Sequence, residues 1–182
     1  MSTLMRSLLL LTAVLLGGVA PARAQNVGTA NVTLNGSIGP GTCTVAAVSK
    51  VMPTLGANVF NPSPTWAGGV SESHTPVDLT LSACSGVTGA TFVFGTAADA
   101  DATNAEFYRN KAANPAPNTA IRLRDTNACS TGNSVRPGAS VSRAFSGASF
   151  SLPLCALYYK LPSGVVSRGG LSTTFTVTVT YR

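Results

Sequence analysis

Four cysteines and one histidine are the residue types in this 182-residue sequence that could support redox or metal chemistry. Cys43, Cys84, Cys129 and Cys155 lie tens of residues apart, no Cys-x-x-Cys pair is present, and His74 is the only histidine. Zinc sites need clustered cysteine and histidine ligands, so this spacing argues against a metal. Disulfides are the favoured use of the cysteines, and four cysteines allow three pairings.

Residues suited to catalysis are sparse. His74 lies in a polar turn, and no Gly-x-Ser-x-Gly nucleophile elbow accompanies it. Asp99, Asp101 and Glu106 lack the glycine and the closing glutamate of a calcium-binding EF-hand loop, so a solvated acidic loop is the better interpretation. No glycine-rich phosphate-binding loop is present. We therefore expect no enzyme activity, no catalytic or metal-binding residues and no cofactor.

Charge gives little support for a nucleic-acid partner. Basic residues number 12 and acidic residues 6, and the basic residues are scattered along the chain, with Arg122 and Arg124 close together. Nucleic-acid binding needs a basic patch or stripe, which this scatter does not provide. Charged residues make up 10% of the chain, well below the usual quarter or so, and such a surface suits a protein packed against neighbours.

The first 24 residues have the pattern of a secretory signal peptide. Arg6 supplies the positive start, residues 8–19 form the apolar run, and Ala22-Arg23-Ala24 offers a small-x-small cleavage site. We predict a signal peptide at residues 1–24 and a mature chain beginning at Gln25. Export reaches an oxidising compartment, which is where disulfides persist.

The strongest structural signal is the alternating stretch at residues 173–181. Phe175, Val177, Val179 and Tyr181 alternate with threonines, as in a β-strand that buries one face. No later segment of this sequence could pair with its far side, so we expect one edge of this strand to stay open. An open edge beside an apolar face invites another strand to pair with it.

A second alternating run covers residues 30–38. Ala30, Val32, Leu34, Gly36 and Ile38 form one row, and polar side chains form the other. A glycine within an apolar row usually marks a bulge or a close approach of another backbone.

The remaining pattern predicts an all-β sandwich. Short apolar or alternating runs are separated by Gly, Pro and Asn turns, without a convincing helical period. We treat residues 97–117 as mainly irregular, although a short helix is conceivable there. Further strands are expected at residues 42–48, 52–55, 75–84, 90–94, 120–124 and 147–159.

The order and spacing of these segments resemble the pilin subunits of the chaperone–usher pathway, in particular the type 1 and P pilus kind. The resemblance covers nearly the whole predicted mature chain. It rests on the alternating residues 30–38, Cys43, Cys84 within Asp-Leu-Thr-Leu-Ser-Ala-Cys, residues 119–125, residues 152–158 and the terminal strand with its penultimate Tyr181. The terminal Arg182 and the two extra cysteines depart from the family's usual pattern.

The resemblance implies an incomplete immunoglobulin-like sandwich that lacks its last strand, with a disulfide between Cys43 and Cys84. It also implies that residues 25–39 are a donor-strand extension and residues 40–182 the pilin domain. Ala30, Val32, Leu34, Gly36 and Ile38 would then form the donor strand. The implied groove-lining residues, which a chaperone's strand would contact, are Phe175, Val177, Val179 and Tyr181. We further predict that Cys129 pairs with Cys155.

The implied function is a structural subunit of an adhesive surface pilus. The implied partners are a periplasmic chaperone, an outer-membrane usher and other pilin subunits, with a host receptor left open. The implied location is the fimbrium, reached through the periplasm. We expect a shaft or minor subunit, because the chain is short for an additional receptor-binding domain.

Two other functions stay open. One is a coat or archaic-pilus subunit of the spore-coat-U kind, which shares the incomplete sandwich. The other is a secreted monomeric β-sandwich that binds a ligand, for example a carbohydrate, with Trp66 and Tyr108 in its loops.

Overall fold

The computed structural model describes residue 33 and residues 41–60, 70–162 and 164–182. By its internal contacts the chain divides into two units, Met1–Ser37 and Ile38–Arg182, and the account below concerns the second. The proposed boundaries of the signal peptide, the extension and the pilin domain stay predictions.

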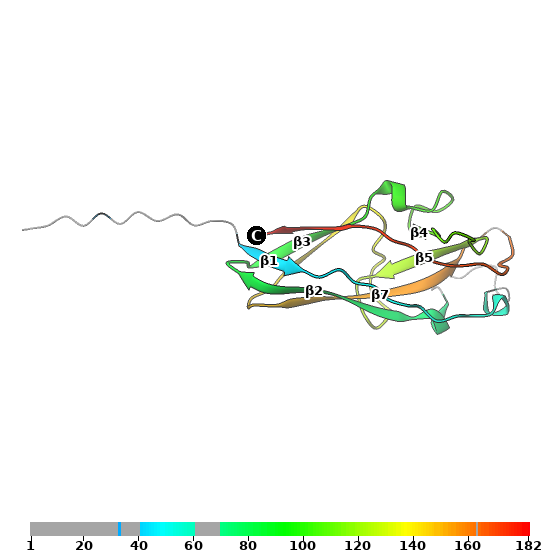
Figure 1. Ribbon diagram of the computed structural model, residues 1–182, viewed down its shortest axis with the longest axis horizontal. Coiled ribbons are helices and arrows are strands. Elements are labelled where there is room, and N and C mark those ends of the chain that lie inside the picture. The colour runs from blue at the N-terminus through cyan, green and yellow to red at the C-terminus, as the bar shows by residue number, and fades with distance from the viewer. Residues whose placement is uncertain (1–32, 34–40, 61–69, 163) are drawn as a thin grey trace, which may run out of the picture. The chain divides into compact units, whose positions relative to one another are not determined.

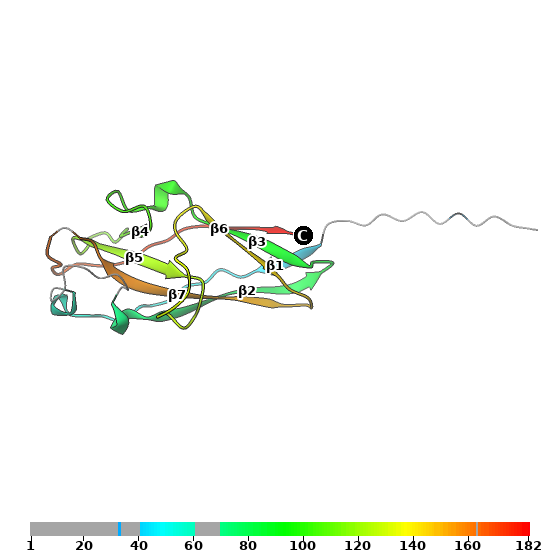
Figure 2. The same ribbon diagram turned by 180° about the vertical axis from the view of Figure 1, so that it is seen from behind.

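The described part of Ile38–Arg182 folds into two antiparallel sheets (Figures 1 and 2). The first has the order β1 (Thr42–Val45), β2 (Thr75–Ser85), β7 (Phe150–Lys160), β5 (Thr119–Arg124) and β4 (Tyr108–Arg109). The second has the order β6 (Ala139–Ala144), β3 (Gly89–Phe94) and β8 (Val177–Tyr181). Three short 3-10 helices, η1 (Ala57–Val59), η2 (Ser71–Ser73) and η3 (Ala97–Asp99), lie in the connections. The all-β prediction is confirmed, and residues 97–117 are mainly irregular as expected.

One hydrophobic core joins the two sheets. Alternating inward residues of each strand meet in it, because successive side chains of a strand point to opposite faces. The strand residues of this core that are at most 6% exposed are Leu79, Leu81, Ala90, Phe92, Phe94, Tyr108, Ile121, Leu123, Leu152 and Leu154. Ile121 and Leu123 face inward as the alternation predicts.

Pro153 shows how β7 tolerates a residue without a backbone N–H. It pairs with Asp78 of β2 on one side. Pairing with β5 on the other side begins only at Cys155. Pro153 therefore lies where β7 is still an edge strand, which is where a sheet accommodates proline.

The structure corrects the predicted strands in four places. The strand expected at residues 42–48 ends at Val45, and no strand forms at residues 52–55, where Pro53 cannot donate to a ladder. The ladder of the terminal strand covers only Val177–Tyr181. Strand β6 was not predicted, since Ala-Ser-Val-Ser-Arg-Ala has little intrinsic preference for a strand. Its six residues are fixed by continuous pairing with β3.

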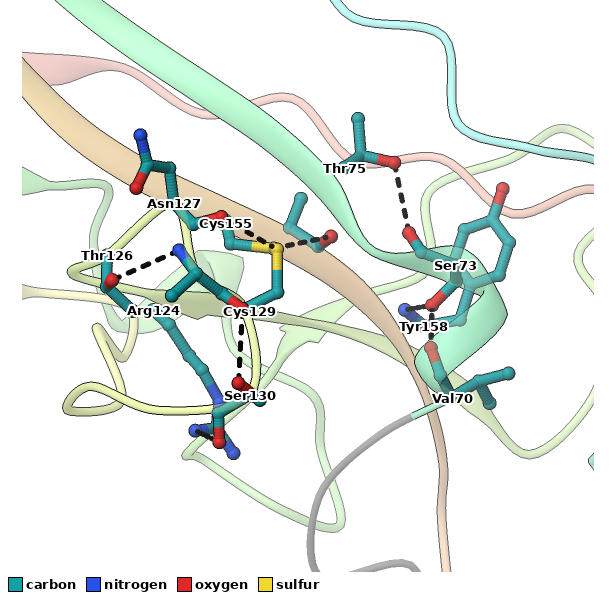
Figure 3. Close-up of a disulfide and its surroundings, with 12 residues drawn as sticks. Val70, Ser73, Thr75, Arg124, Thr126, Asn127, Cys129, Ser130, Cys155 and Tyr158 are labelled. Carbon is teal, nitrogen blue, oxygen red and sulfur yellow. Dashed lines mark hydrogen bonds between the residues drawn. A yellow bond between two sulfur atoms is a disulfide. The ribbon is translucent and has the colours of Figure 1, made fainter.

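Two disulfides close the domain, in the pairing that the sequence interpretation gave. Cys43 joins Cys84, which ties β1 to β2. Cys129 joins Cys155, which ties the loop after β5 to the middle of β7 (Figure 3). Cys129, Cys155 and Leu157 form a small buried cluster on the outer side of the first sheet.

A buried serine joins η2 to β7 (Figure 3). The Ser73 hydroxyl donates to the Val70 carbonyl at 2.5 Å and accepts from the Tyr158 backbone N–H at 2.7 Å. Ser73 is fully buried, and both hydrogen bonds compensate for the loss of water around its hydroxyl.

We predict that replacing both Cys129 and Cys155 by alanine lowers the free energy of unfolding by about 3 kcal/mol, because the cross-link restricts the unfolded chain. The two cysteines are 26 residues apart in sequence. Urea denaturation followed by circular dichroism measures the difference, with Asn127→Ala as a control in the same loop. A loss below about 1 kcal/mol, the typical net worth of one hydrogen bond, would mean that the loop is held by its hydrogen bonds instead.

Candidate strand-binding groove

Four strands, β1, β4, β6 and β8, have one neighbour each among the described residues, and two of them, β1 and β8, come together at one end of the domain. Strand β1 pairs only with β2, and β8 pairs only with β3. The Tyr181 hydroxyl donates to the Cys43 carbonyl at 3.0 Å, so the start of β1 lies beside the end of β8. The chain after β1 runs away from this end of the domain, and the chain before β8 runs back toward it (Figure 1). The two segments face each other across the cavities described below.

A groove of about 570 Å³ lies between these two segments. Its walls are residues 45–50 on one side and residues 173–177 on the other. Its floor consists of Val77, Leu79, Phe94, Leu123 and Leu154. The last four of these are at most 6% exposed, so the groove opens directly onto the main core.

The apolar row of the terminal strand faces inward but is only half covered. Phe175, Val177, Val179 and Tyr181 are each partly buried, and the threonines between them are exposed. The predicted alternation is thereby confirmed. Phe175 and Val177 line the groove, whereas Val179 and Tyr181 pack against the core farther along. That these residues contact a chaperone stays a prediction.

Backbone groups with unused hydrogen-bonding capacity line the wall formed by the terminal strand. The carbonyls of Ser172 and Thr176 accept hydrogen bonds from the domain side, and Arg182 exchanges hydrogen bonds with Gly89. In an extended strand adjacent residues direct their backbone groups to opposite sides. The N–H and C=O groups of Phe175, Val177 and the other odd-numbered residues therefore point toward the groove.

The opposite wall has the same property. Residues 46–50 form no ladder after β1 ends at Val45, and no backbone hydrogen bond joins them to the rest of the described chain. The groove thus combines an apolar floor with two backbone edges that can pair. A β-strand offers both complements, since its backbone groups pair sideways and every second side chain points downward.

A second cavity, of about 580 Å³, continues between the same two segments toward the end of the domain that lies away from Tyr181. Residues 52–57 and Phe60 form one side and residues 166–171 the other. Tyr158 closes it from below, and its hydroxyl donates to the Pro53 carbonyl at 3.1 Å. Burial raises the pKa of the Tyr158 hydroxyl, so this group stays a neutral hydrogen-bond donor.

Charge is scarce along both cavities. Lys50 lines the first and Arg168 the second, and no acidic residue lines either one. Asp99 does not line the cavities and forms an ion pair with Lys111, with 2.6 Å between Asp99 Oδ1 and Lys111 Nζ. The hydrogen bond from Lys111 is the main cause of the lowered pKa of Asp99. The groove is therefore suited to an uncharged strand.

Tyr108 is not in a loop, so the sequence interpretation was wrong about its environment. It lies in β4, is fully buried and stacks on Phe175 with ring centroids 4.4 Å apart. Burial raises the pKa of its hydroxyl far above the usual value. Tyr108 supports the groove from below and is not available as a surface platform for a ligand.

Several predicted residues lie outside the described part of the chain. They are Trp66 and the donor-strand residues Ala30, Val32, Leu34, Gly36 and Ile38. Their roles stay predictions. Within the described residues, no group of three or more His, Cys, Asp or Glu side chains could hold a metal ion, and no helix is long and apolar enough to cross a membrane.

Comparison with known proteins identifies the family. The model of the family described as "Fimbrial protein" matches residues 32–182. The chain belongs to the fimbrial protein family. Members of this family are structural pilus subunits, which places this fimbrial protein in a surface fimbrium among other subunits.

Solved structures agree with the fold. A subunit from a chaperone–usher pilus is 17% identical, with a TM-score of 0.59 over 90% of this chain and 100% of that chain. The P pilus rod subunit PapA is 14% identical, with a TM-score of 0.60 over 77% of this chain and 99% of that chain. Both likenesses support the incomplete immunoglobulin-like sandwich. No curated protein matches the sequence significantly.

The sequence interpretation found one wall of the groove and missed most of the rest. The alternation at residues 173–181 identified the wall at the terminal strand. Residues 45–48 of the opposite wall were expected to belong to the strand predicted at residues 42–48. The floor residues Phe94 and Leu123 carried no signal that separated them from the other core residues.

We predict that Val177→Thr weakens binding of a peptide with the sequence of residues 25–39 about tenfold when the domain is refolded from urea in the presence of the peptide, because the substitution buries a hydroxyl without a partner, at about 1–2 kcal/mol. Thr178→Val is the matched control, since Thr178 is exposed on the opposite face. Fluorescence anisotropy of the labelled peptide measures the Kd of each variant. Equal Kd values for both variants would show that the peptide does not occupy the groove.

Proposed function

We propose that this fimbrial protein polymerises by donor-strand exchange, in which residues 30–38 of one subunit fill the groove of the next. The observation that carries the proposal is the groove itself, which has an apolar floor and two walls of unpaired backbone. A strand from another molecule would complete the sheet and cover the core.

The dimensions of donor and acceptor agree. Residues 30–38 are nine residues, about 30 Å when extended. The edge of the acceptor from residue 173 to residue 181, whose first five residues line the groove, is also nine residues long. In an extended donor every second side chain points toward the floor, so Val32, Leu34 and Ile38 would insert there. Gly36 would lie where the floor comes closest to the donor backbone. The extension from Gln25 to Gly39 carries no charge, which agrees with a groove that offers no acidic residue.

Exposed apolar side chains mark the same place. Four large hydrophobic residues are exposed among those described; two of them, Val45 and Val48, line one wall of the groove, and Val51 directly follows that wall. Val51 is 94% exposed. Exposed large apolar side chains that gather in one part of a surface often mark an interaction site.

The geometry favours an open filament. Strand β1 begins at the end of the domain where β8 finishes, since Cys43 lies beside Tyr181 there. The donor segment and the acceptor groove are different surfaces, so the contact is heterologous. After two subunits have joined, one of them still has a free donor segment and the other still has a free groove. Repetition of this contact builds a fibre.

The energy of the contact is large enough for a persistent fibre. Each buried aliphatic side chain contributes about 1.5–3 kcal/mol. Val32, Leu34 and Ile38 would each contribute in this range, and ladder hydrogen bonds along both walls would add to it.

A subunit with an open groove needs protection before assembly. We infer that a periplasmic chaperone lends a strand to the groove and that an outer-membrane usher exchanges it for the donor strand of the next subunit. The two disulfides support transit through an oxidising compartment. Catalysis is not part of this proposal.

For the alternative of a monomeric ligand-binding sandwich, Trp66 and Tyr108 were the candidate ligand-binding aromatic residues. Tyr108 is buried and cannot bind a ligand at the surface. A coat or archaic-pilus subunit would share the groove and would differ in its partners.

Expression of residues 25–182 in the periplasm, with and without the cognate chaperone, tests the proposal. We expect a one-to-one complex with the chaperone, and degradation or aggregation without it. A stable, soluble monomer produced without any chaperone would contradict the proposal.

We predict that Leu34→Asp leaves the chaperone complex intact but abolishes polymerisation, because a carboxylate cannot be buried on the apolar floor. Gly36→Val should act similarly by steric conflict. Asn35→Asp is the matched control, since it adds the same charge on the polar row of the donor. Electron microscopy of the fibres gives the outcome, and normal fibres from Leu34→Asp would refute the assignment of the donor residues.

A further inference from the structure

A pull on a fibre of these subunits would enter each domain at the start of β1. The proposed donor residues 30–38 lie directly ahead of this strand in the sequence, and Cys43 is its second residue. Cys43 is covalently joined to Cys84 at the end of β2. The force therefore reaches the disulfide before it reaches the groove wall at residues 45–50.

The disulfide passes this force to the second sheet by a short route. Only residues 86–88 separate β2, which contains Cys84, from β3, and β3 pairs with β8 at five positions. The Thr88 and Gly89 N–H groups both donate to the backbone oxygen of Arg182, which closes the end of this ladder. Strand β8 in turn is an edge with which the neighbour's donor strand would pair.

Two contacts hold the start of β1 at this place. Gly41 packs so closely against the backbone of Gly86 that a Cβ atom at Gly41 would collide with the Gly86 carbonyl. The Tyr181 hydroxyl donates to the Cys43 carbonyl at 3.0 Å. The entry point of the force, the first disulfide and the end of the β3–β8 ladder therefore lie together at one end of the domain.

Without this disulfide the same force would run through the groove wall. Strand β1 is held to β2 by three ladder positions, and residues 46–50 after it form no backbone hydrogen bond with the rest of the described chain. Among the described residues the next strand begins only at Thr75. Peeling β1 away would therefore carry off one of the two edges that hold the donor strand.

We propose that the Cys43–Cys84 disulfide keeps tension out of the groove wall, so that a subunit under load retains its neighbour's donor strand. The disulfide closes a loop over residues 44–83, and a force that enters at one cysteine and leaves at the other bypasses this loop. The Cys129–Cys155 disulfide lies outside the route from Cys43 to β8. The inference rests on the proposed function, since it concerns subunits already joined in a fibre.

The test holds wild-type fibres at constant force in optical tweezers, with and without dithiothreitol. Dithiothreitol reduces a disulfide by thiol–disulfide exchange and is itself oxidised to a cyclic disulfide. Cys43 and Cys84 are partly exposed, whereas Cys129 and Cys155 are at most 3% exposed, so the reagent reaches the first disulfide more readily. We expect the reductant to shorten the lifetime of loaded fibres about tenfold, which corresponds to about 1.4 kcal/mol in the barrier to release.

The length gained under load identifies the disulfide that was broken. Release of the chain from Cys43 as far as Thr75, where β2 begins, adds about 110 Å at about 3.4 Å per residue. Release of all 41 residues as far as Cys84 adds about 140 Å. The 26 residues between Cys129 and Cys155 would add about 90 Å, and we expect no step of that size.

Two double variants separate the roles of the disulfides. Cys129→Ala with Cys155→Ala is the matched control, because it removes the disulfide outside the route, and its fibres should behave like the wild type in both buffers. Cys43→Ala with Cys84→Ala should show the shorter lifetime in both buffers. If this second variant does not fold or assemble, the comparison of wild-type fibres in the two buffers decides alone.

The proposal is overturned if loaded wild-type fibres keep their lifetime and length in the reductant while alkylation shows that Cys43 and Cys84 are reduced. Fibres of Cys43→Ala with Cys84→Ala that last as long as the wild type would also overturn it. Either result leaves donor-strand exchange unaffected. If wild-type subunits form no fibre at all, donor-strand exchange and the protection of the groove wall are both wrong.

Discussion

Backbone hydrogen bonding at two strand edges is the constraint on which this structure depends. Strand β8 has β3 on one side and a groove on the other, and the segment after β1 faces the same groove. Paired backbone groups are the rule in folded proteins, because an unpaired group withdrawn from water costs free energy. A domain that leaves two such edges beside its own core is completed only by another strand.

Covalent and buried polar contacts hold the strands around the groove together. The disulfide between Cys43 and Cys84 ties β1 to β2, which leaves the first wall anchored at its start. The second disulfide and the hydrogen bonds of buried Ser73 attach β7 to the loop after β5 at Cys155 and to η2 at Tyr158.

Sequence reasoning worked best where the pattern was local. Strict alternation over residues 173–181 was enough to assign Phe175 and Val177 to the inward face, because strand periodicity does not depend on tertiary context. It failed for β6, whose residues have weak strand preference and are ordered by pairing with β3. It also failed for Tyr108, since a tyrosine in an irregular stretch gives no sign of whether another element covers it. The pairing of Cys43 with Cys84 came from the family resemblance, because four cysteines alone allow three pairings.

The amino-acid sequence by itself determined the class of the fold, the inward row of the terminal strand and the presence of an uncharged alternating segment that could serve as a donor. Each of these follows from residue types at neighbouring positions. Tertiary structure decided where the groove lies, which residues form its second wall and floor, and that Lys111 contacts both Asp99 and the Thr174 carbonyl. These features join segments between 12 and 138 residues apart, such as Asp99 with Lys111 and Cys43 with Tyr181, and no local pattern records which distant segments will meet.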